Sequence, residues 1–149
     1  MLPRSPSAEV LIRLALADEQ PTIHAFVQAI ADETFAYLVP LPVPLGEPSW
    51  QSAWVAVAEG HIAGVTMTQE DWVSDLWIAR DHRRQGIGSL LLARAEREIA
   101  SRGYRVFRLR VVESNTRAVD FYLSHGWNVH HEFPHEKFGH AMFEMNKSA

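Results

Sequence analysis

Two arginines and two glycines stand close together in one short segment of the chain: Arg83-Arg84-Gln85-Gly86-Ile87-Gly88. A strand-like run, Val73 to Ala79, precedes this segment, and a helix-like run, Ser89 to Arg102, follows it. Glycine has no Cβ, so the chain can turn tightly and a ligand can approach its backbone. The N–H groups and the dipole at the start of a helix favour an anion there. The segment therefore predicts a phosphate or pyrophosphate site, with arginines to neutralise the charge.

Two common phosphate-binding loops do not match this segment. The P-loop requires a Lys after its last glycine, but Ser89 follows Gly88 directly. The dinucleotide-binding pattern G-x-G-x-x-G requires a third glycine where this chain has Leu91. The pattern that does match is Arg-x-x-Gly-x-Gly between a strand and a helix. Because two adjacent arginines taken alone are more often a solvated surface pair, a second group of residues is needed.

That second group lies between residues 113 and 127. It has an Asn, an Ala three residues later, an aromatic-Tyr pair, and a Gly followed by an aromatic residue: Asn115, Ala118, Phe121-Tyr122 and Gly126-Trp127. Together the two segments resemble the GNAT superfamily of N-acyltransferases, in which the CoA pyrophosphate rests on the arginine–glycine turn. The resemblance extends over residues 53 to 146, with a weaker match at the N-terminus.

The resemblance implies acetyl-CoA as a co-substrate and assigns it contacts along the chain. The pyrophosphate would bind main-chain N–H groups from Arg84 to Ser89, with the Ser89 hydroxyl as a further donor. Pantetheine would pair as an extra strand with the backbone of Leu76, Trp77 and Ile78. The Asn115 amide can donate to and accept from a pantetheine amide. Asn115 is also suited to cap the helix that we expect after it.

The resemblance also implies direct attack of a neutral amine on the thioester, with both substrates bound. Tyr122 would protonate the departing thiolate, although an aromatic residue beside Phe121 is equally compatible with a core position. The N–H of Ile78 would stabilise the oxyanion. The same reading predicts an acyltransferase whose partner is an amine acceptor, on a small molecule or a protein.

The general base cannot be carried over from the family. Some members place a Glu on the strand before the Asn, where this chain has Arg110. The nearest carboxylates are Asp75 and Glu113, and each is also compatible with an ordinary surface role. Strand alternation predicts that Asp75 shares a face with Trp77. Either carboxylate could act through water, or no single base exists. A CoA-binding sensor without transfer activity and a transferase for longer acyl groups are the alternatives.

Composition bounds the function further. The chain has 149 residues, a net charge of −4 and no cysteine. The acidic balance argues against nucleic-acid binding, and the missing cysteine excludes disulfides and a thioester on the enzyme. No apolar run reaches membrane-span length and no signal peptide is recognisable, so we expect no membrane partner and a cytoplasmic location. His130, His131, His135 and His140 match no metal-ligand spacing, and neighbours on a strand such as His130 and His131 are expected to point to opposite faces, so we expect no metal site.

The length predicts one domain over residues 1–149, which the resemblance identifies as an N-acetyltransferase domain. We expect strands at residues 10–16, 53–58, 61–68, 72–79, 105–112, 127–133 and 137–145, and helices that begin near Asp18, Ser89 and Asn115. Asp18 is a plausible cap of the first helix, the Glu59-Gly60 pair predicts a hairpin turn, and Gly103 is placed to end the second helix. These elements predict an α/β (α+β) fold, a twisted mixed and mostly antiparallel sheet of about seven strands with helices on both faces. By resemblance the sheet is splayed between its fourth and fifth strands, and a homodimer is possible. The proline-rich stretch from Tyr37 to Ser49 cannot form a long helix, and in the family this region carries acceptor-binding elements.

Overall fold

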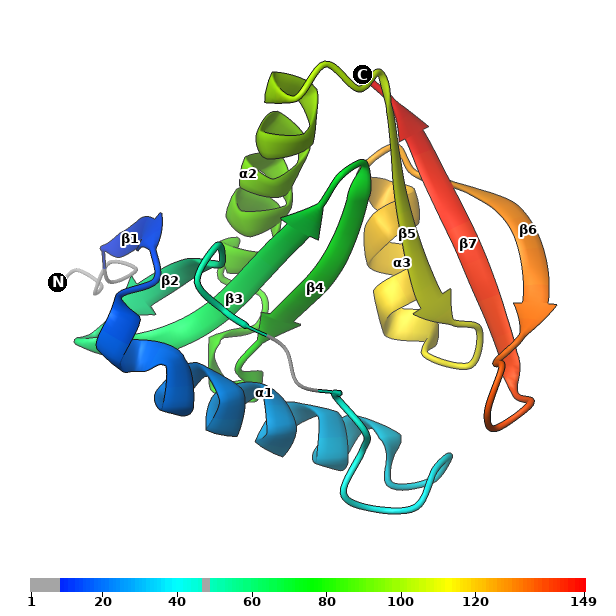
Figure 1. Cartoon of the computed structure of the whole chain (residues 1–149), viewed down its shortest axis with the longest axis horizontal. Helices are drawn as coiled ribbons and strands as arrows, with labels where there is room; N and C mark the ends of the chain where they lie inside the picture. Colours follow the sequence, from blue (N-terminus) through cyan, green and yellow to red (C-terminus); the bar gives the residue numbers. More distant parts are fainter. Residues whose placement is uncertain (1–8, 47–48) are drawn as a thin grey trace, which may run out of the picture. The chain divides into compact units, whose positions relative to one another are not determined.

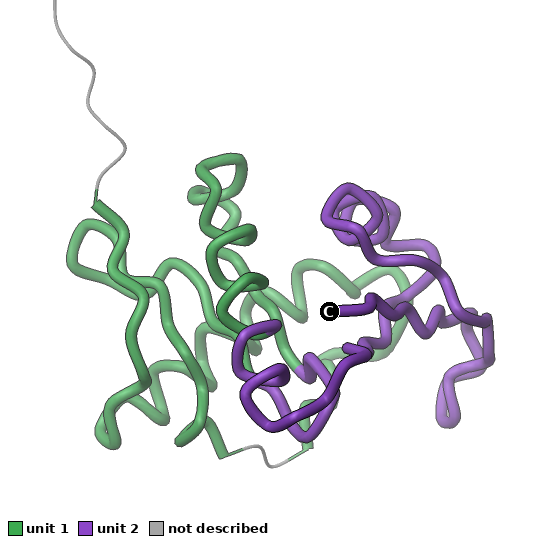
Figure 2. Tube along the Cα trace, turned by 90° about the horizontal axis from the view of Figure 1, so that it is seen from above, with its two compact units in different colours: residues 1–67, 75–95 green, residues 68–74, 96–149 purple. Residues whose placement is uncertain are grey.

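The computed structural model describes residues 9–46 and 49–149 of the chain. The chain forms two compact units (Figure 2). Unit 1 comprises Met1–Met67 and Asp75–Ala95, and unit 2 comprises Thr68–Ser74 and Glu96–Ala149. That the whole chain is one domain stays a prediction, and residues 1–8 and Pro48 lie outside the described residues.

The described part of the chain contains seven strands and three α-helices (Figure 1). The strands are β1 (Val10–Leu14), β2 (Trp54–Ala58), β3 (His61–Gln69), β4 (Trp72–Ile78), β5 (Val106–Val112), β6 (Asn128–Pro134) and β7 (Ala141–Ser148). The helices are α1 (Gln20–Phe35), α2 (Ile87–Ser101) and α3 (Thr116–Ser124), with short 3-10 helices η1 (Ala17–Glu19) and η2 (Arg80–His82). None of these helices combines the length and apolarity needed to cross a bilayer.

The strands form one open sheet in the order β1-β2-β3-β4-β5-β7-β6. β4 and β5 are parallel, with Trp72 opposite Arg108. The pairs β1–β2, β2–β3, β5–β7 and β6–β7 are antiparallel. A mixed, mostly antiparallel sheet of seven strands is therefore confirmed. How β4 and β5 continue beyond this pair involves both units and stays a prediction.

In unit 1, α1 and α2 cover opposite faces of β2 and β3 (Figure 1). One buried cluster joins α1 to the sheet: Ile23, Val27, Trp50, Ala53, Val55 and Val65. The other joins α2 to the sheet: Ala56, Ala58, Ala63, Ile87 and Leu91. Successive residues of a strand point to opposite faces, so neighbours such as Val55 and Ala56 pack against different helices. Helices on both faces are confirmed.

Gly64 on β3 lets α2 pack close to the sheet. A Cβ added at Gly64 would lie 2.8 Å from Leu91 Cδ1, 3.0 Å from Ile78 Cδ1 and 3.2 Å from Ile87 Cγ2. Because Ile87 is the first residue of α2, the missing side chain sets how closely the start of this helix approaches β3.

In unit 2, the second half of α2 is tied to β7 and to the segment after α3. The Glu96 carboxylate accepts a hydrogen bond from Trp127 Nε1 at 3.1 Å and from Lys147 Nζ at 2.9 Å. The Trp127 ring lies 6.5 Å from that of Phe107, centroid to centroid. The buried Trp127 indole therefore packs its apolar ring against Phe107 and has a hydrogen-bond acceptor for its N–H.

Three predicted boundaries were wrong. β7 begins at Ala141 and not at residue 137, because residues 135–140 form a turn in which His135 N–H donates to His140 O at 2.7 Å. Asp18 is not a helix cap, because it lies inside η1 and α1 begins at Gln20. α2 begins two residues before the predicted Ser89.

Two turns follow the prediction. The β2–β3 hairpin turns through Glu59 and Gly60, whose φ angles are 54° and 79°, as a type I′ turn requires. Gly103, with φ 94°, ends α2. The proline-rich stretch forms no long helix in residues 37–46 and 49, its described part.

Candidate active site

The arginine–glycine turn contains two residues in the left-handed region. After η2, the Arg83 N–H donates to Arg80 O at 3.2 Å. Arg84 then has φ 65° and Gly86 has φ 82°. Glycine adopts such angles freely, but for a residue with a Cβ they cost about 1–2 kcal/mol. Backbone strain of this kind gathers at ligand sites and is held there by the surrounding structure. The strain at Arg84 therefore marks this turn as a candidate site.

The turn leads directly into α2 and is open to solvent. Arg84, Gln85 and Gly86 are exposed, and nothing lies within 4 Å of the place where a Gly86 Cβ would stand. The first helical bond runs from Leu90 N–H to Gly86 O at 3.1 Å. N–H groups before this point in a helix, such as that of Ile87, have no carbonyl acceptor within it. The segment therefore has the exposure and the donors that an anion site requires.

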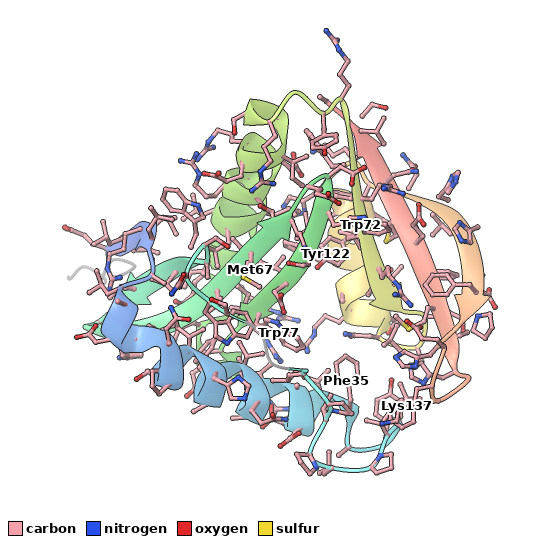
Figure 3. The ribbon with its side chains drawn as sticks, in the orientation of Figure 1. Phe35, Met67, Trp72, Trp77, Tyr122 and Lys137 are labelled. Atoms are coloured by element: carbon pink, nitrogen blue, oxygen red, sulfur yellow. The ribbon has the colours of Figure 1, made fainter. Side chains whose placement is uncertain are left out.

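The end of β4 is anchored by its side chains on both faces in unit 1. Leu76 and Ile78 pack against the α2 cluster, whereas Trp77 packs against the α1 cluster. Figure 3 shows Trp77 between β4 and α1. Asp75 Oδ1 accepts a hydrogen bond from Trp77 Nε1 at 2.9 Å. The prediction that Asp75 shares a face with Trp77, opposite Leu76 and Ile78, is confirmed.

A buried hydroxyl fixes the main chain of β4 next to these residues. Thr66 on β3 has no exposed surface, and its Oγ1 donates to Asp75 O at 2.8 Å. A buried hydroxyl must find a partner, so this bond specifies the backbone one residue before Leu76. No pattern in the sequence indicates this role, because an isolated Thr in a strand is usually explained by β-propensity alone.

Asn115 lies at the start of α3 in unit 2. Its N–H donates to Val112 O at 3.0 Å, and its carbonyl accepts from Val119 N–H at 3.1 Å. Its side chain makes no capping hydrogen bond to the helix. The position before the helix was predicted correctly, but the side chain does not cap it.

Tyr122 is mostly buried, with 9% of its surface exposed. It lies on α3 (Figure 3), and its ring centroid is 5.4 Å from that of Phe121 and 6.1 Å from that of Trp127. The Tyr122 carbonyl also accepts a hydrogen bond from Trp127 N–H at 3.1 Å. The aromatic neighbours fix the direction of the ring, which suits a positioned phenol as well as a core residue.

Arg110 is paired with a carboxylate from the turn between β6 and β7. Its Nη2 lies 2.7 Å from Glu136 Oε2, and its guanidinium carbon lies 4.5 Å from the Phe133 ring centroid. The hydrogen bond from Arg110 lowers the pKa of Glu136 to about 2. Glu113, the base candidate that lies in unit 2, is half-buried, and its N–H donates to Ala141 O at 3.1 Å.

The late histidines are arranged differently from the prediction. The register of β6 shifts between Val129 and His131, so His130 and His131 do not simply alternate between faces. Their ring centroids lie 5.3 Å apart. Ligand atoms of these two residues and Glu144 lie within 4.8 Å of one another. The β-bulge explains the error, because an extra residue in one strand breaks the alternation.

A model of the Acetyltransferase (GNAT) family matches residues 17–127. This range contains the arginine–glycine turn, β4, Asn115 and Tyr122. The chain therefore belongs to the acetyltransferase (GNAT) family, and the family assigns it to the acyltransferases, as the sequence predicted.

Two curated relatives and one solved structure are consistent with this assignment. The chain is 30% identical to thialysine N-epsilon-acetyltransferase of Sus scrofa over 137 residues, which are 85% of this chain and 71% of the relative. It is 32% identical to N-alpha-acetyltransferase 60 of Xenopus tropicalis over 71 residues, which are 46% of this chain and only 29% of that relative. The crystal structure of the PaiA N-acetyltransferase from Thermoplasma acidophilum, in complex with coenzyme A, superposes with a TM-score of 0.73 at 16% identity and covers 95% of this chain and 99% of that one. This structural likeness shows the fold alone.

Proposed function

We propose that the protein transfers an acetyl group from acetyl-CoA to a primary amine by direct attack within a ternary complex. The observation that carries the proposal is the exposed turn with left-handed Arg84 and Gly86 directly before α2. Membership of the acetyltransferase (GNAT) family supports it, as does the coenzyme A held by the structural neighbour from Thermoplasma acidophilum.

The proposed pyrophosphate contacts come from the backbone of this turn. The N–H groups from Arg84 to Ser89 donate to the phosphate oxygens, helped by the Ser89 hydroxyl. The guanidinium groups of Arg83 and Arg84 neutralise the charge. Exposure of the turn, with room beside Gly86, supports these roles.

The proposed pantetheine contacts come from Leu76, Trp77, Ile78 and Asn115. An extended chain with two amides can pair with a strand edge through its backbone. Rigid anchoring of β4 supports this role, because the side chains of Leu76, Trp77 and Ile78 are packed and need not reorganise. The Asn115 side chain makes no capping bond, which leaves its amide suited to a ligand amide.

The proposed reaction forms a C–N bond and breaks the C–S bond of the thioester. A neutral amine attacks the carbonyl, since an alkylammonium with a pKa near 10 has no lone pair. The Ile78 N–H stabilises the tetrahedral oxyanion. As the intermediate collapses, the thiolate of CoA leaves and takes a proton from the Tyr122 hydroxyl. The amine proton leaves through water or a carboxylate.

Asp75 and Glu113 are the proposed carriers of that proton. Arg110 cannot act as a base, because it is a cation paired with Glu136. Trp77 orients the Asp75 carboxylate through the hydrogen bond to Oδ1. The pH profile of kcat/KM for Asp75→Asn and Glu113→Gln separates them, because loss of the base removes its acid limb.

The proposed acceptor is a primary amine on a small molecule or a protein. The names of the two curated relatives specify an N-epsilon amine of thialysine and an N-alpha amine. The first acceptors to test are therefore thialysine, lysine and short peptides with a free N-terminus.

Release of free thiol from acetyl-CoA in the presence of these amines tests the proposal. The expected result is amine-dependent release, with an acetylated product of matching amount by mass spectrometry. A protein that binds CoA and releases no thiol with any amine would instead be a sensor, and the transferase proposal would be wrong. Acyl-CoA donors of increasing chain length in the same assay separate acetyl transfer from transfer of a longer group.

A further inference from the structure

Glu59, His61 and His82 gather in unit 1, beside the arginine–glycine turn. We propose that these three residues form a binding site for a divalent transition-metal ion, of which Zn²⁺ is the test case. Ligand atoms of the three side chains lie within 4.8 Å of one another. The site is separate from the proposed acetyl transfer, and nothing in that reaction requires it.

The two imidazoles are already spaced for a shared metal ion. His61 Nε2 and His82 Nε2 are 3.1 Å apart. Two nitrogens bound tetrahedrally to Zn²⁺ are separated by roughly 3.3 Å, from Zn–N bonds of about 2.0–2.1 Å. The rings therefore need to move apart by only a few tenths of an ångström, roughly, to admit the ion.

The hydrogen bonds of the other ring nitrogens direct both lone pairs into this gap. His61 Nδ1 lies 3.2 Å from Glu59 O, which only accepts, so Nδ1 carries the proton. His82 Nδ1 lies 3.2 Å from Gln85 Oε1. We assign Oε1 to this side of Gln85 because the amide nitrogen Nε2 faces Asp81 O at 3.5 Å.

With both Nδ1 atoms protonated, two neutral Nε2 atoms face each other as acceptors. Such a contact is repulsive unless a cation lies between them. Metal-binding histidines commonly donate the other ring N–H to a carbonyl, which is the pattern of His61 and His82 here. A shared proton is the competing occupant, but it gives no role to the Glu59 carboxylate.

Two imidazole nitrogens and one carboxylate oxygen make a ligand set that suits Zn²⁺, with the fourth position left for water. Glu59 and His61 are exposed at the hairpin turn, so an ion can reach the site, whereas His82 is 8% exposed and held in place. A bound ion would clamp the β2–β3 hairpin to η2, immediately before Arg83. The site would thereby restrain the segment that carries the proposed pyrophosphate contacts.

Sequence spacing concealed this site. His61 and His82 are separated by 21 residues and match no metal-binding motif. Only the fold brings the start of β3 beside η2, so the expectation of a chain without a metal site came from linear spacing.

Isothermal titration of Zn²⁺ into the full-length protein, with any histidine tag removed, tests the proposal. We expect saturable binding that weakens about 10-fold or more in both His61→Ala and Glu59→Gln. His131→Ala is the matched control, because it removes an exposed histidine of the other candidate cluster. Its titration should keep the component that His61→Ala loses.

Co²⁺ provides a second readout, because a tetrahedral Co²⁺ site has a strong visible absorption. That absorption should appear with wild type and be absent in His61→Ala. Wild type that binds no Zn²⁺, or His61→Ala that binds it as tightly as wild type, overturns the proposal and leaves the shared proton as the occupant.

Discussion

The turns before α2 and α3 both lead from a strand into a helix, but their backbone conformations differ. Each helix follows a strand, β4 or β5, through a short turn that must redirect the chain. The turn before α2 uses two left-handed residues, Arg84 and Gly86. The turn before α3 uses none; Asn115 has φ −82°, and its N–H bonds back to Val112 O at 3.0 Å.

The difference shows where the chain retains strain. A turn between a strand and a helix does not require a left-handed arginine, as the start of α3 demonstrates. The turn before α2 nevertheless keeps one, at a cost of about 1–2 kcal/mol. Under the proposed function, that cost aligns N–H groups for a pyrophosphate, whereas the start of α3 places the side chains of Asn115 and Tyr122. The turn before α2 should therefore act on the affinity for CoA, and Tyr122 on α3 should act on the rate of transfer.

Substitution Tyr122→Phe should have the largest effect and separates the two roles. Loss of the proposed general acid should lower kcat about 100-fold or more, while the affinity for CoA is retained. Steady-state kinetics and CoA titration provide the two readouts. Tyr104→Phe, at a residue that is 40% exposed, is the control and should match wild type. An unchanged kcat in Tyr122→Phe would assign thiolate protonation to another group.

Substitution Gly86→Ala tests the first turn through its backbone. The added Cβ has space, but the left-handed conformation becomes unfavourable by about 1–2 kcal/mol, which corresponds to about tenfold weaker CoA binding if the turn must keep this shape. Gly103→Ala is matched to it, because Gly103 has φ 94° and also has nothing within 4 Å of its Cβ position. Only Gly86→Ala should lose affinity, because its exposed turn can relax in the free protein and must regain the left-handed shape to bind CoA. Equal CoA affinities would contradict the role of the turn.

Substitution Gly64→Ala tests how the sheet supports the start of α2. Its Cβ would enter the space of Leu91, Ile78 and Ile87, so the free energy of unfolding should fall by about 1–3 kcal/mol. Chemical denaturation measures this loss. The double variant Gly64→Ala/Leu91→Ala should lose less stability than the sum of the losses in the two single variants, because the shorter side chain at residue 91 removes the contact at 2.8 Å. Strict additivity would show that the contact does not limit the packing of α2.

The smallest effect concerns the start of α1, which an ion pair supports. The Glu19 carboxylate binds the Arg13 guanidinium at 2.8 and 2.9 Å and accepts the Leu16 N–H at 2.8 Å. The hydrogen bond from Arg13, with that of Leu16, lowers the pKa of Glu19 from its ordinary 4.5 to about 2.

A carboxyl group with a lowered pKa stabilises the fold above its unfolded pKa and loses this effect as the pH falls through the folded value. Glu19→Gln should therefore cost about 1 kcal/mol of unfolding free energy at pH 7. The difference from wild type should decline below the ordinary pKa of 4.5 and vanish below about 2. Glu33→Gln, which removes an exposed ion pair with Arg80, should leave the free energy of unfolding almost unchanged both at pH 7 and at acidic pH. A pH-independent loss in Glu19→Gln would show that the carboxylate charge does not matter.

Much of the fold could be predicted from local patterns. Alternation and glycine placement predicted the β2–β3 hairpin, the shared face of Asp75 and Trp77, and the end of α2 at Gly103. The same local patterns predicted the order of the elements. The start of β7 was placed too early, because only the turn closed by the hydrogen bond from His135 N–H to His140 O removes residues 137–140 from the strand.

Features that depend on tertiary contacts could not be predicted from the sequence. The left-handed conformation of Arg84 has no sequence signal, since arginine rarely adopts it. The bulge at His130 breaks alternation without a glycine to indicate it. The hydrogen bond from Thr66 to the Asp75 carbonyl, and the pairing of His61 with His82, join residues that are distant along the chain. The candidate site could therefore be located by its motif, but its supporting bonds could not.

The proposed function rests on the binding of the CoA pyrophosphate by main-chain amides of the turn before α2. Titration of the ¹⁵N-labelled protein with CoA, followed through its amide resonances, tests this binding residue by residue. We expect the largest shifts at the amides of Arg84 to Ser89. Binding of CoA that leaves these resonances unchanged, or no binding at all, would contradict it.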